Sequence, residues 1–196
     1  MVNHYFTDPI KEIKKSQLPG IGLSASSDSP ISGVIKDGTG GNYSHAFWII
    51  WDEINNMPVA ASQDLVFKTR PLLDYLHRTG KLKVYYLKIT DEEKEKLMKV
   101  ILEDLGKPKW KTRYDWPMFI GQTLASITKI EWFKKIQAPW IHFCSEIIAS
   151  HLKKALNIIV TNAKNKPVKH PNPPDLNEFC RKIEEKFGLL GRWVAD

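Results

Sequence analysis

The amino-acid sequence predicts an α+β domain, with a sheet formed mainly by the first half of the chain and helices formed mainly by the second. Before residue 90, compact apolar runs rich in aromatic and β-branched residues are typical of buried strands. After residue 90, apolar residues recur at the spacing of a helix face. The length of 196 residues suits a single domain, which we take as residues 1–196.

The predicted strands follow a segment that favours turns. Residues 16–44 are rich in Ser, Gly and Pro, a composition typical of loops. Residues 46–51 then form an apolar run that ends at Asp52, which predicts a buried strand. After a polar turn at Asn55 and Asn56, residues 59–62 predict the returning strand of a hairpin. Residues 82–89 predict a third strand.

The predicted helices begin at residue 90, where Thr90 and Glu93 have the spacing of a capping box. This first helix ends at Gly106, and its apolar stripe consists of Leu97, Met98, Ile101, Leu102 and Leu105. A second helix is predicted over residues 118–130. A third begins at about Cys144, with a buried face formed by Ile148, Leu152, Ala155 and Ile159. Residues 164–174 read as a loop, after which Asp175 caps a last short helix through Lys186.

Composition excludes several classes of protein. With 42% hydrophobic and 26% charged residues, the chain can bury a core, which argues against intrinsic disorder. No apolar run approaches the ~18–20 residues of a transmembrane helix. The first eight residues lack the basic and apolar regions of a secretory signal, so we expect a cytoplasmic or virion-associated protein. The two cysteines lack the spacing of a zinc site, and no metal or cofactor is expected.

The net charge of +7 favours anionic partners, such as an acidic cell-wall polymer, an anionic lipid surface or a nucleic acid. The positive residues stand in short separate runs, which is also typical of an ordinary solvated surface. No zinc finger, helix-turn-helix or RNA-binding signature accompanies them. Nucleic acid is therefore the least favoured of these partners.

Two residues have the position that nucleophilic catalysis requires. Cys144 stands at a predicted helix start, where the helix dipole and free amides stabilise a thiolate; the alternative is a buried, inert cysteine. His45 opens the most apolar strand directly after the Gly-rich residues 38–44, so it can face a cleft; the alternative is a hydrogen-bonded histidine at a strand edge. His151 lies about 10.5 Å along the helix from Cys144, which is too far for a hydrogen bond between them.

The order and spacing of several motifs resemble a known family. The motifs are Tyr43-Ser44-His45, Val59-Ala60-Ala61-Ser62, Leu105-Gly106-Lys107-Pro108, Tyr114-Asp115, Phe143-Cys144-Ser145-Glu146 and Pro173-Pro174-Asp175-Leu176. Together they resemble the circularly permuted branch of the NlpC superfamily of papain-like cysteine hydrolases, with YiiX-like proteins as the nearest type. The resemblance covers about residues 20–180. It implies an antiparallel sheet packed by helices, with the His-bearing strand first and the Cys-bearing helix last.

The resemblance also implies roles for individual residues. Cys144 becomes the nucleophile, His45 the base, and Tyr114 a neighbour of the oxyanion site. Relative to the family, five additional residues, 109–113, displace Tyr114. Relatives carry a polar residue that orients the histidine about where this chain has alanines, so Ser62, Gln63 or a main-chain carbonyl is expected to take that place. Glu146 is expected either to support the local loop or to take part in catalysis.

The implied activity is hydrolysis of an amide or ester through an acyl-enzyme on the cysteine. The expected substrate is a cell-wall peptide, as for a peptidoglycan peptidase or amidase, or a lipid-like acyl compound. Two alternatives stay open. One is a catalytically weakened domain that binds a lipid, a peptide or a protein partner, and the other is a basic nucleic-acid-binding protein.

Overall fold

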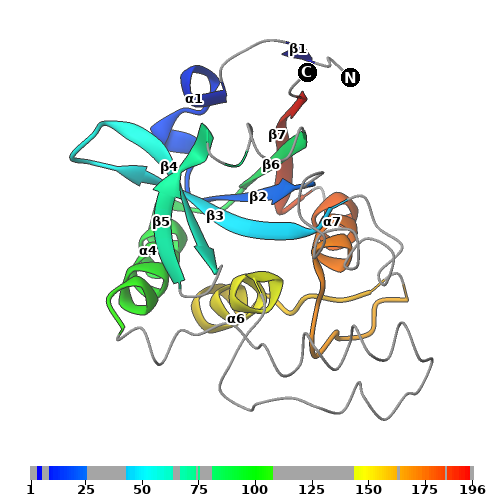
Figure 1. Ribbon diagram of the computed structural model, residues 1–196. Helices are drawn as coiled ribbons and strands as arrows, with labels where there is room; N and C mark the ends of the chain where they lie inside the picture. The colour runs from blue at the N-terminus through cyan, green and yellow to red at the C-terminus, as the bar shows by residue number, and fades with distance from the viewer. Residues whose placement is uncertain are drawn as a thin grey trace, which may run out of the picture.

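A computed structural model describes residues 4–5, 9–25, 43–63, 67–73, 75, 81–107, 144–162, 164–183 and 185–194. Its described strands form one sheet in the order β1-β7-β6-β2-β3-β4-β5 (Figure 1). These strands are β1 (His4–Tyr5), β2 (Gly20–Ser24), β3 (His45–Asp52), β4 (Met57–Gln63), β5 (Phe67–Pro71), β6 (Lys81–Leu87) and β7 (Phe187–Val194). β1 pairs in parallel with β7, and the other pairings are antiparallel. The chain is α+β, as the sequence predicts.

The described helices are α1 (Pro9–Glu12), α4 (Asp91–Leu105), α6 (Cys144–Leu156) and α7 (Pro173–Lys182), with a 3-10 turn at Lys15–Gln17. α4 and α6 contact each other and lie below the sheet in Figure 1. α7 lies beside the end of β3 that is opposite the β3–β4 turn. None of the described helices has both the length and the apolar composition needed to span a bilayer.

β3 is buried on both faces because the sheet separates two apolar clusters. Side chains alternate along a strand, so Ala46 and Trp48 face the cluster that contains α4 and α6. Phe47 and Ile49 face the opposite cluster, together with Tyr75. The predicted hairpin is confirmed, since β3 and β4 are antiparallel with Trp48 opposite Ala61. The sheet is packed by helices as expected, and the helix that begins at Cys144 contacts both strands of this hairpin.

The capping box predicted for the first helix is present at the start of α4. The Glu93 amide donates to Thr90 Oγ1 at 3.2 Å, and the Thr90 amide donates to Glu93 Oε2 at 2.9 Å. The predicted stripe is partly wrong, because Leu102 is 53% exposed whereas Val100 is buried. Successive helix residues lie about 100° apart, so Leu102 turns away from the face that Leu97 and Ile101 bury.

The prediction of loops over residues 16–44 is wrong for β2, which is fully buried between β3 and β6. The glycines of β2 favour the prediction of a loop although the segment is a central strand. Gly22 is nevertheless required at its position. A Cβ added at Gly22 would lie 2.3 Å from the ring of Phe47, which covers this point of the strand. Glycine therefore serves close packing here rather than a turn.

The ends of the last helices also differ from prediction. α6 ends at Leu156 because Asn157 adopts a positive φ of 54°, and Ile159 lies beyond the helix with 47% of its surface exposed. α7 begins at Pro173 and is capped by Asn172, whose Oδ1 accepts from the Asp175 amide at 2.8 Å. It ends at Lys182, and β7 follows where the helix was predicted to continue. The predicted helix 118–130 lies outside the described residues.

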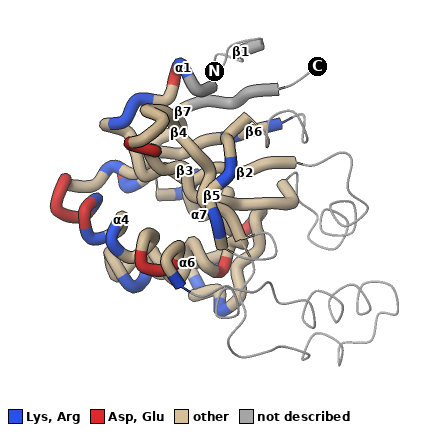
Figure 2. The backbone as a smooth tube through the Cα atoms, turned by 60° about the vertical axis from the view of Figure 1, so that its left-hand side comes forward, with Lys and Arg blue, Asp and Glu red and all other residues tan. Residues whose placement is uncertain are grey.

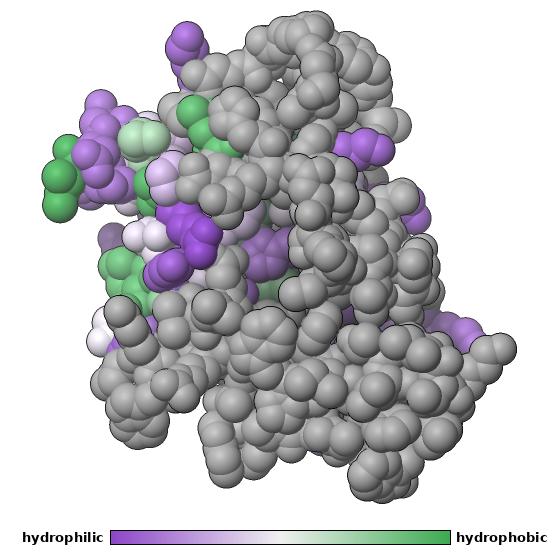
Figure 3. Space-filling model, in the orientation of Figure 1, coloured by the Kyte–Doolittle hydropathy of each residue, from purple (hydrophilic) through white to green (hydrophobic). Residues whose placement is uncertain are grey.

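Charged and apolar side chains are dispersed over the described surface. Figure 2 shows basic residues on several elements, interleaved with acidic ones along α4. At the left edge of Figure 3, apolar and polar residues stand together where the β3–β4 hairpin of Figure 1 ends. Ile54, in this turn, is 94% exposed. Single exposed apolar residues of this kind are ordinary in soluble folds and indicate no site.

Candidate active site

Cys144 and His45 come together although they are 99 positions apart in the sequence. Cys144 is the first residue of α6, and His45 is the first residue of β3. The Cys144 thiol is hydrogen bonded to the His45 ring and to the backbone amides of Ala46 and Ser145. Its side chain is buried, with 3% of the residue exposed. The first residues of one helix and one strand therefore bring a thiol and an imidazole into contact.

This environment favours the thiolate. Burial raises the pKa of the Cys144 thiol, but the positive charge of His45 opposes it, as do hydrogen bonds from the His45 ring and the two amides. The lowering effects are the larger, so the pKa of Cys144 lies below that of an ordinary cysteine. A thiolate paired with an imidazolium is the reactive form of a cysteine nucleophile.

Cys180, in α7, is the natural comparison within the same chain. It is as deeply buried as Cys144, with 1% of its surface exposed. Burial raises the pKa of the Cys180 thiol strongly, and the charge of Lys83 offsets only part of this effect. The two cysteines therefore differ in their charged and hydrogen-bonding partners, whereas their access to solvent is similar.

The second nitrogen of His45 has a side-chain partner. His45 Nε2 lies 2.7 Å from Oγ of Ser62, a fully buried residue of β4. An imidazole has two ring nitrogens, so we assign the contact with the thiol to Nδ1. The ring of His45 stacks on that of Tyr75, with 5.5 Å between centroids and 10° between planes. Ser62 and Tyr75 thus restrict the position and the rotation of the imidazole.

The structure distributes the other predicted site residues differently. Gln63 is buried beside Ser62 in β4, but successive strand residues point to opposite faces, so it lies on the face turned toward α6. Glu146 makes a contact with the loop before α7, because its Oε1 lies 2.6 Å from Nδ1 of His170. Ser145 Oγ donates to the carbonyl of Pro171 at 2.5 Å. Tyr114 lies outside the described residues.

Ser145 and Glu146 together anchor the loop that precedes α7 to the first turn of α6. Both side chains are buried, and both reach this loop while the neighbouring Cys144 faces His45. Of the two roles expected for Glu146, the observed contact corresponds to support of the local loop.

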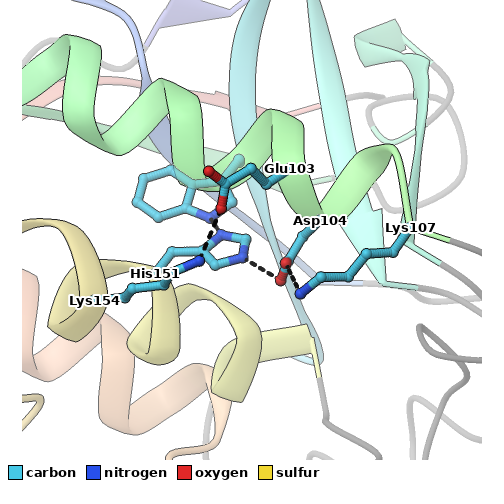
Figure 4. A network of polar contacts seen from close by, with 6 residues as sticks. Glu103, Asp104, Lys107, His151 and Lys154 are labelled. Atoms are coloured by element: carbon cyan, nitrogen blue, oxygen red, sulfur yellow. Dashed lines mark hydrogen bonds and ion pairs between the residues drawn. The ribbon is translucent and has the colours of Figure 1, made fainter.

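Sequence reasoning missed a buried polar chain behind the site. Trp48 Nε1 donates to His151 Nδ1 at 3.0 Å, and His151 Nε2 lies 2.9 Å from Asp104 Oδ2 (Figure 4). The seven-residue spacing places His151 near the same helix face as Cys144, but no local pattern in the sequence marks its partners Trp48 and Asp104. Tyr75 was also missed, and no local pattern marks it, because its stacking on His45 depends on the folded chain. Within the described part of the chain, no group of three or more His, Cys, Asp or Glu residues could hold a metal ion.

Comparisons with known proteins support the fold. No family model matches this sequence. A search of curated proteins finds no significant match. Among solved structures, the crystal structure of the metalloprotein YiiX from Escherichia coli O157:H7 is similar, with a TM-score of 0.55 and 22% sequence identity. The match covers 76% of this chain and 71% of that one. The chain therefore has a YiiX-like α+β fold.

Proposed function

We propose that this protein is a cysteine hydrolase that cleaves amide or ester bonds through an acyl-enzyme on Cys144. The observation that carries the proposal is the contact of the Cys144 thiol with the His45 ring and two backbone amides, which lowers the pKa of the thiol. The YiiX-like fold is compatible with the resemblance to permuted papain-like hydrolases, in which a histidine on an early strand serves a cysteine on a late helix.

In the proposed reaction, the Cys144 thiolate attacks the carbonyl carbon, and a carbon–sulfur bond forms. Backbone amides at the start of α6 stabilise the negative charge on the carbonyl oxygen. His45 donates its proton to the leaving nitrogen or oxygen, whose bond to carbon breaks. Water then attacks the thioester and gives a proton to His45; the acid is released, and the thiolate is restored.

The proposed substrate is a peptide amide of the cell-wall type, as for a peptidoglycan peptidase or amidase. This choice rests on the family resemblance, and the net charge of +7 suits an anionic polymer or surface. A lipid-like acyl substrate is the second class that the same chemistry serves.

One observation favours a different function, a weakened domain that binds a lipid, peptide or protein partner. The group on His45 Nε2 is the hydroxyl of Ser62, which carries no negative charge to stabilise an imidazolium. Reactivity of Cys144 separates the two functions, because a binding module needs no ionised thiol.

The test is alkylation by iodoacetamide between pH 5 and 9, with the labelled peptides resolved by mass spectrometry. We expect Cys144 to react at least about tenfold faster than Cys180 near pH 7, because the thiolate fraction rises about tenfold for each unit by which the pKa falls. His45→Ala is expected to slow labelling of Cys144 and to leave Cys180 unchanged. Cys144→Ala is expected to abolish hydrolysis of p-nitrophenyl acetate and of peptidoglycan stem peptides.

The two buried cysteines serve as controls for each other, because similar access predicts similar rates in the absence of a special partner. Equal labelling of both in the folded protein, indifferent to His45→Ala, would remove Cys144 as a nucleophile. The binding function would then be the better explanation.

A further inference from the structure

α6 and β3 are joined by side-chain contacts at two positions along their lengths. At the first, Cys144 of α6 meets His45 of β3. At the second, His151 of α6 accepts a hydrogen bond from the indole of Trp48 of β3 at 3.0 Å. Both residues of the second contact are fully buried, with 1% of His151 and none of Trp48 exposed. The same helix and strand thus carry the proposed reacting pair and a second, directional contact.

The distance between the two contacts is nearly the same along α6 as along β3. Seven residues separate Cys144 from His151, which corresponds to about 10.5 Å along a helix. Three residues separate His45 from Trp48, which corresponds to about 10 Å along a strand. This odd spacing places the two side chains on opposite faces of β3, and Cys144 meets His45 at the first residue of the strand. A slide of α6 along β3, or a rotation about its own axis, would therefore break the second contact as it moved the thiol from His45.

His151 is itself held from the other side. The indole N–H can only donate, so His151 Nδ1 accepts and the ring proton lies on Nε2. That N–H donates to Asp104 Oδ2 of α4 at 2.9 Å, and Asp104 is also in contact with Lys107. In Figure 4 the imidazole lies between the indole and the carboxylate. Both ring nitrogens are used, which fixes the tautomer and the orientation of the ring.

We propose that His151, held between Trp48 and Asp104, is a positioning residue that sets the placement of Cys144 against His45. The inference rests on the proposed function, because it concerns the geometry of that same pair. Apolar packing alone is non-directional and tolerates small shifts of a helix, whereas a hydrogen bond loses strength steeply with distance and angle. The Trp48–His151–Asp104 chain supplies the directional constraint.

The experiment measures the pH–rate profile of iodoacetamide alkylation at Cys144 in the folded protein. His151→Leu removes both hydrogen bonds, and Trp48→Phe removes only the indole donor. For each, we expect the midpoint of the profile to rise by about one pH unit, which corresponds to an alkylation rate about tenfold lower below both midpoints. His151→Gln keeps one acceptor and one donor and is expected to restore most of the wild-type profile.

Lys154→Met is the matched control. Like His151→Leu, it removes a contact between α6 and α4, but a different one. Lys154 Nζ lies 2.9 Å from Glu103 Oε2, and both side chains are about half exposed. This variant is expected to keep the wild-type midpoint. Thermal melts of all variants show that alkylation is measured on folded protein. If His151→Leu does not fold, Trp48→Phe decides the matter.

The outcomes separate this inference from the proposed function. A wild-type midpoint below that of an ordinary thiol, retained by His151→Leu and Trp48→Phe despite lower stability, would reduce the chain to a structural role and overturn the positioning role alone. An equal rise of the midpoint in Lys154→Met would also overturn it. A wild-type midpoint equal to that of an ordinary thiol would overturn the proposed function and the positioning role together.

Discussion

His45 has different partners on its two ring nitrogens, and their chemistry sets what this residue can do. On one side, the thiol of Cys144 gains stabilisation from a protonated ring. On the other, the Ser62 hydroxyl at 2.7 Å can accept or donate, so it orients the imidazole in either protonation state. A carboxylate at this place would favour the imidazolium strongly, whereas a hydroxyl favours it weakly. The contact between His45 and Ser62 therefore orients the imidazole more than it stabilises a positive charge on the ring.

This interpretation predicts a large effect of Ser62→Ala and a small effect of Ser62→Thr. Alanine leaves His45 Nε2 without this hydroxyl in a partly buried place, so we expect alkylation of Cys144 at pH 7 to fall about tenfold, the equivalent of 1.4 kcal/mol. Threonine keeps the hydroxyl and suits a strand, so its rate is expected to lie near that of the wild type. Rates measured by mass spectrometry test the pair, and equal slowing in both variants would contradict an orienting role for the hydroxyl.

At this scale, the sequence predicts the residues whose position follows from local patterns. Cys144 and His45 stand at the start of a predicted helix and a predicted strand, and Ser62 lies on the returning strand of the same hairpin. The remaining contacts join elements that are distant in sequence. Trp48 reads as a core residue, and only the docking of α6 on β3 brings its indole to His151. Such contacts need the tertiary structure.

At the scale of elements, β2 helps to position His45 although it contributes none of the proposed reacting groups. β2 lies between β6 and β3, with Gly22 opposite both Phe47 and Val84. The ring of Phe47 covers Gly22 and stacks on Tyr75 at 4.3 Å, and Tyr75 in turn stacks on His45. The absence of a side chain at Gly22 thus makes room for the rings that hold the imidazole.

We therefore expect Gly22→Ala to destabilise the fold and to disturb the site. The added Cβ would meet three atoms of the buried Phe47 ring within 2.8 Å, and overpacking of this kind costs about 1–3 kcal/mol. Urea unfolding measures this loss, and alkylation of Cys144 is expected to slow as Phe47 displaces Tyr75 and His45. Gly106→Ala is the control, because its Cβ would meet only backbone at 3.5 Å or more. Equal stability of the two variants would contradict the close-packing role of Gly22.

The elements that the sequence predicts are those with a strong local signal. The 46–51 strand has an apolar run, and the 90–105 helix has a capping box and a periodic stripe. β2 has neither, because three of its five residues, Gly20, Gly22 and Ser24, are typical of turns. β7 follows α7 after a short connection and owes its conformation to antiparallel pairing with β6. Strands that depend on distant partners have a weak local pattern.

At the scale of the whole molecule, Asp104 joins the sheet, α6 and α4 through one buried network. Burial raises the pKa of its carboxyl, but hydrogen bonds from His151 and Lys107, together with the positive charge of Lys107, lower it to about 2 from the ordinary value of 3.8. A carboxyl whose pKa is lower in the folded state binds its proton more weakly there than in the unfolded chain. Its stabilising effect is therefore complete above about pH 5, where the carboxyl is ionised in both states, and is lost as the pH falls toward 2.

We expect the free energy of unfolding to decrease between pH 5 and pH 2, and Asp104→Asn to remove part of that decrease. The difference in pKa corresponds to a stabilisation on the order of 1–2 kcal/mol, after allowance for solvent screening of a side chain that is 18% exposed. Urea unfolding at a series of pH values measures both proteins. Other carboxyl groups, such as that of Glu103, are unchanged in the variant, so the difference between the two curves isolates Asp104.

Curves that stay parallel down to pH 2 would show that its charge does not couple the helices to the sheet. A convergence of the two curves as the pH falls is the expected result, because protonation removes from the wild type the same charge that asparagine lacks throughout.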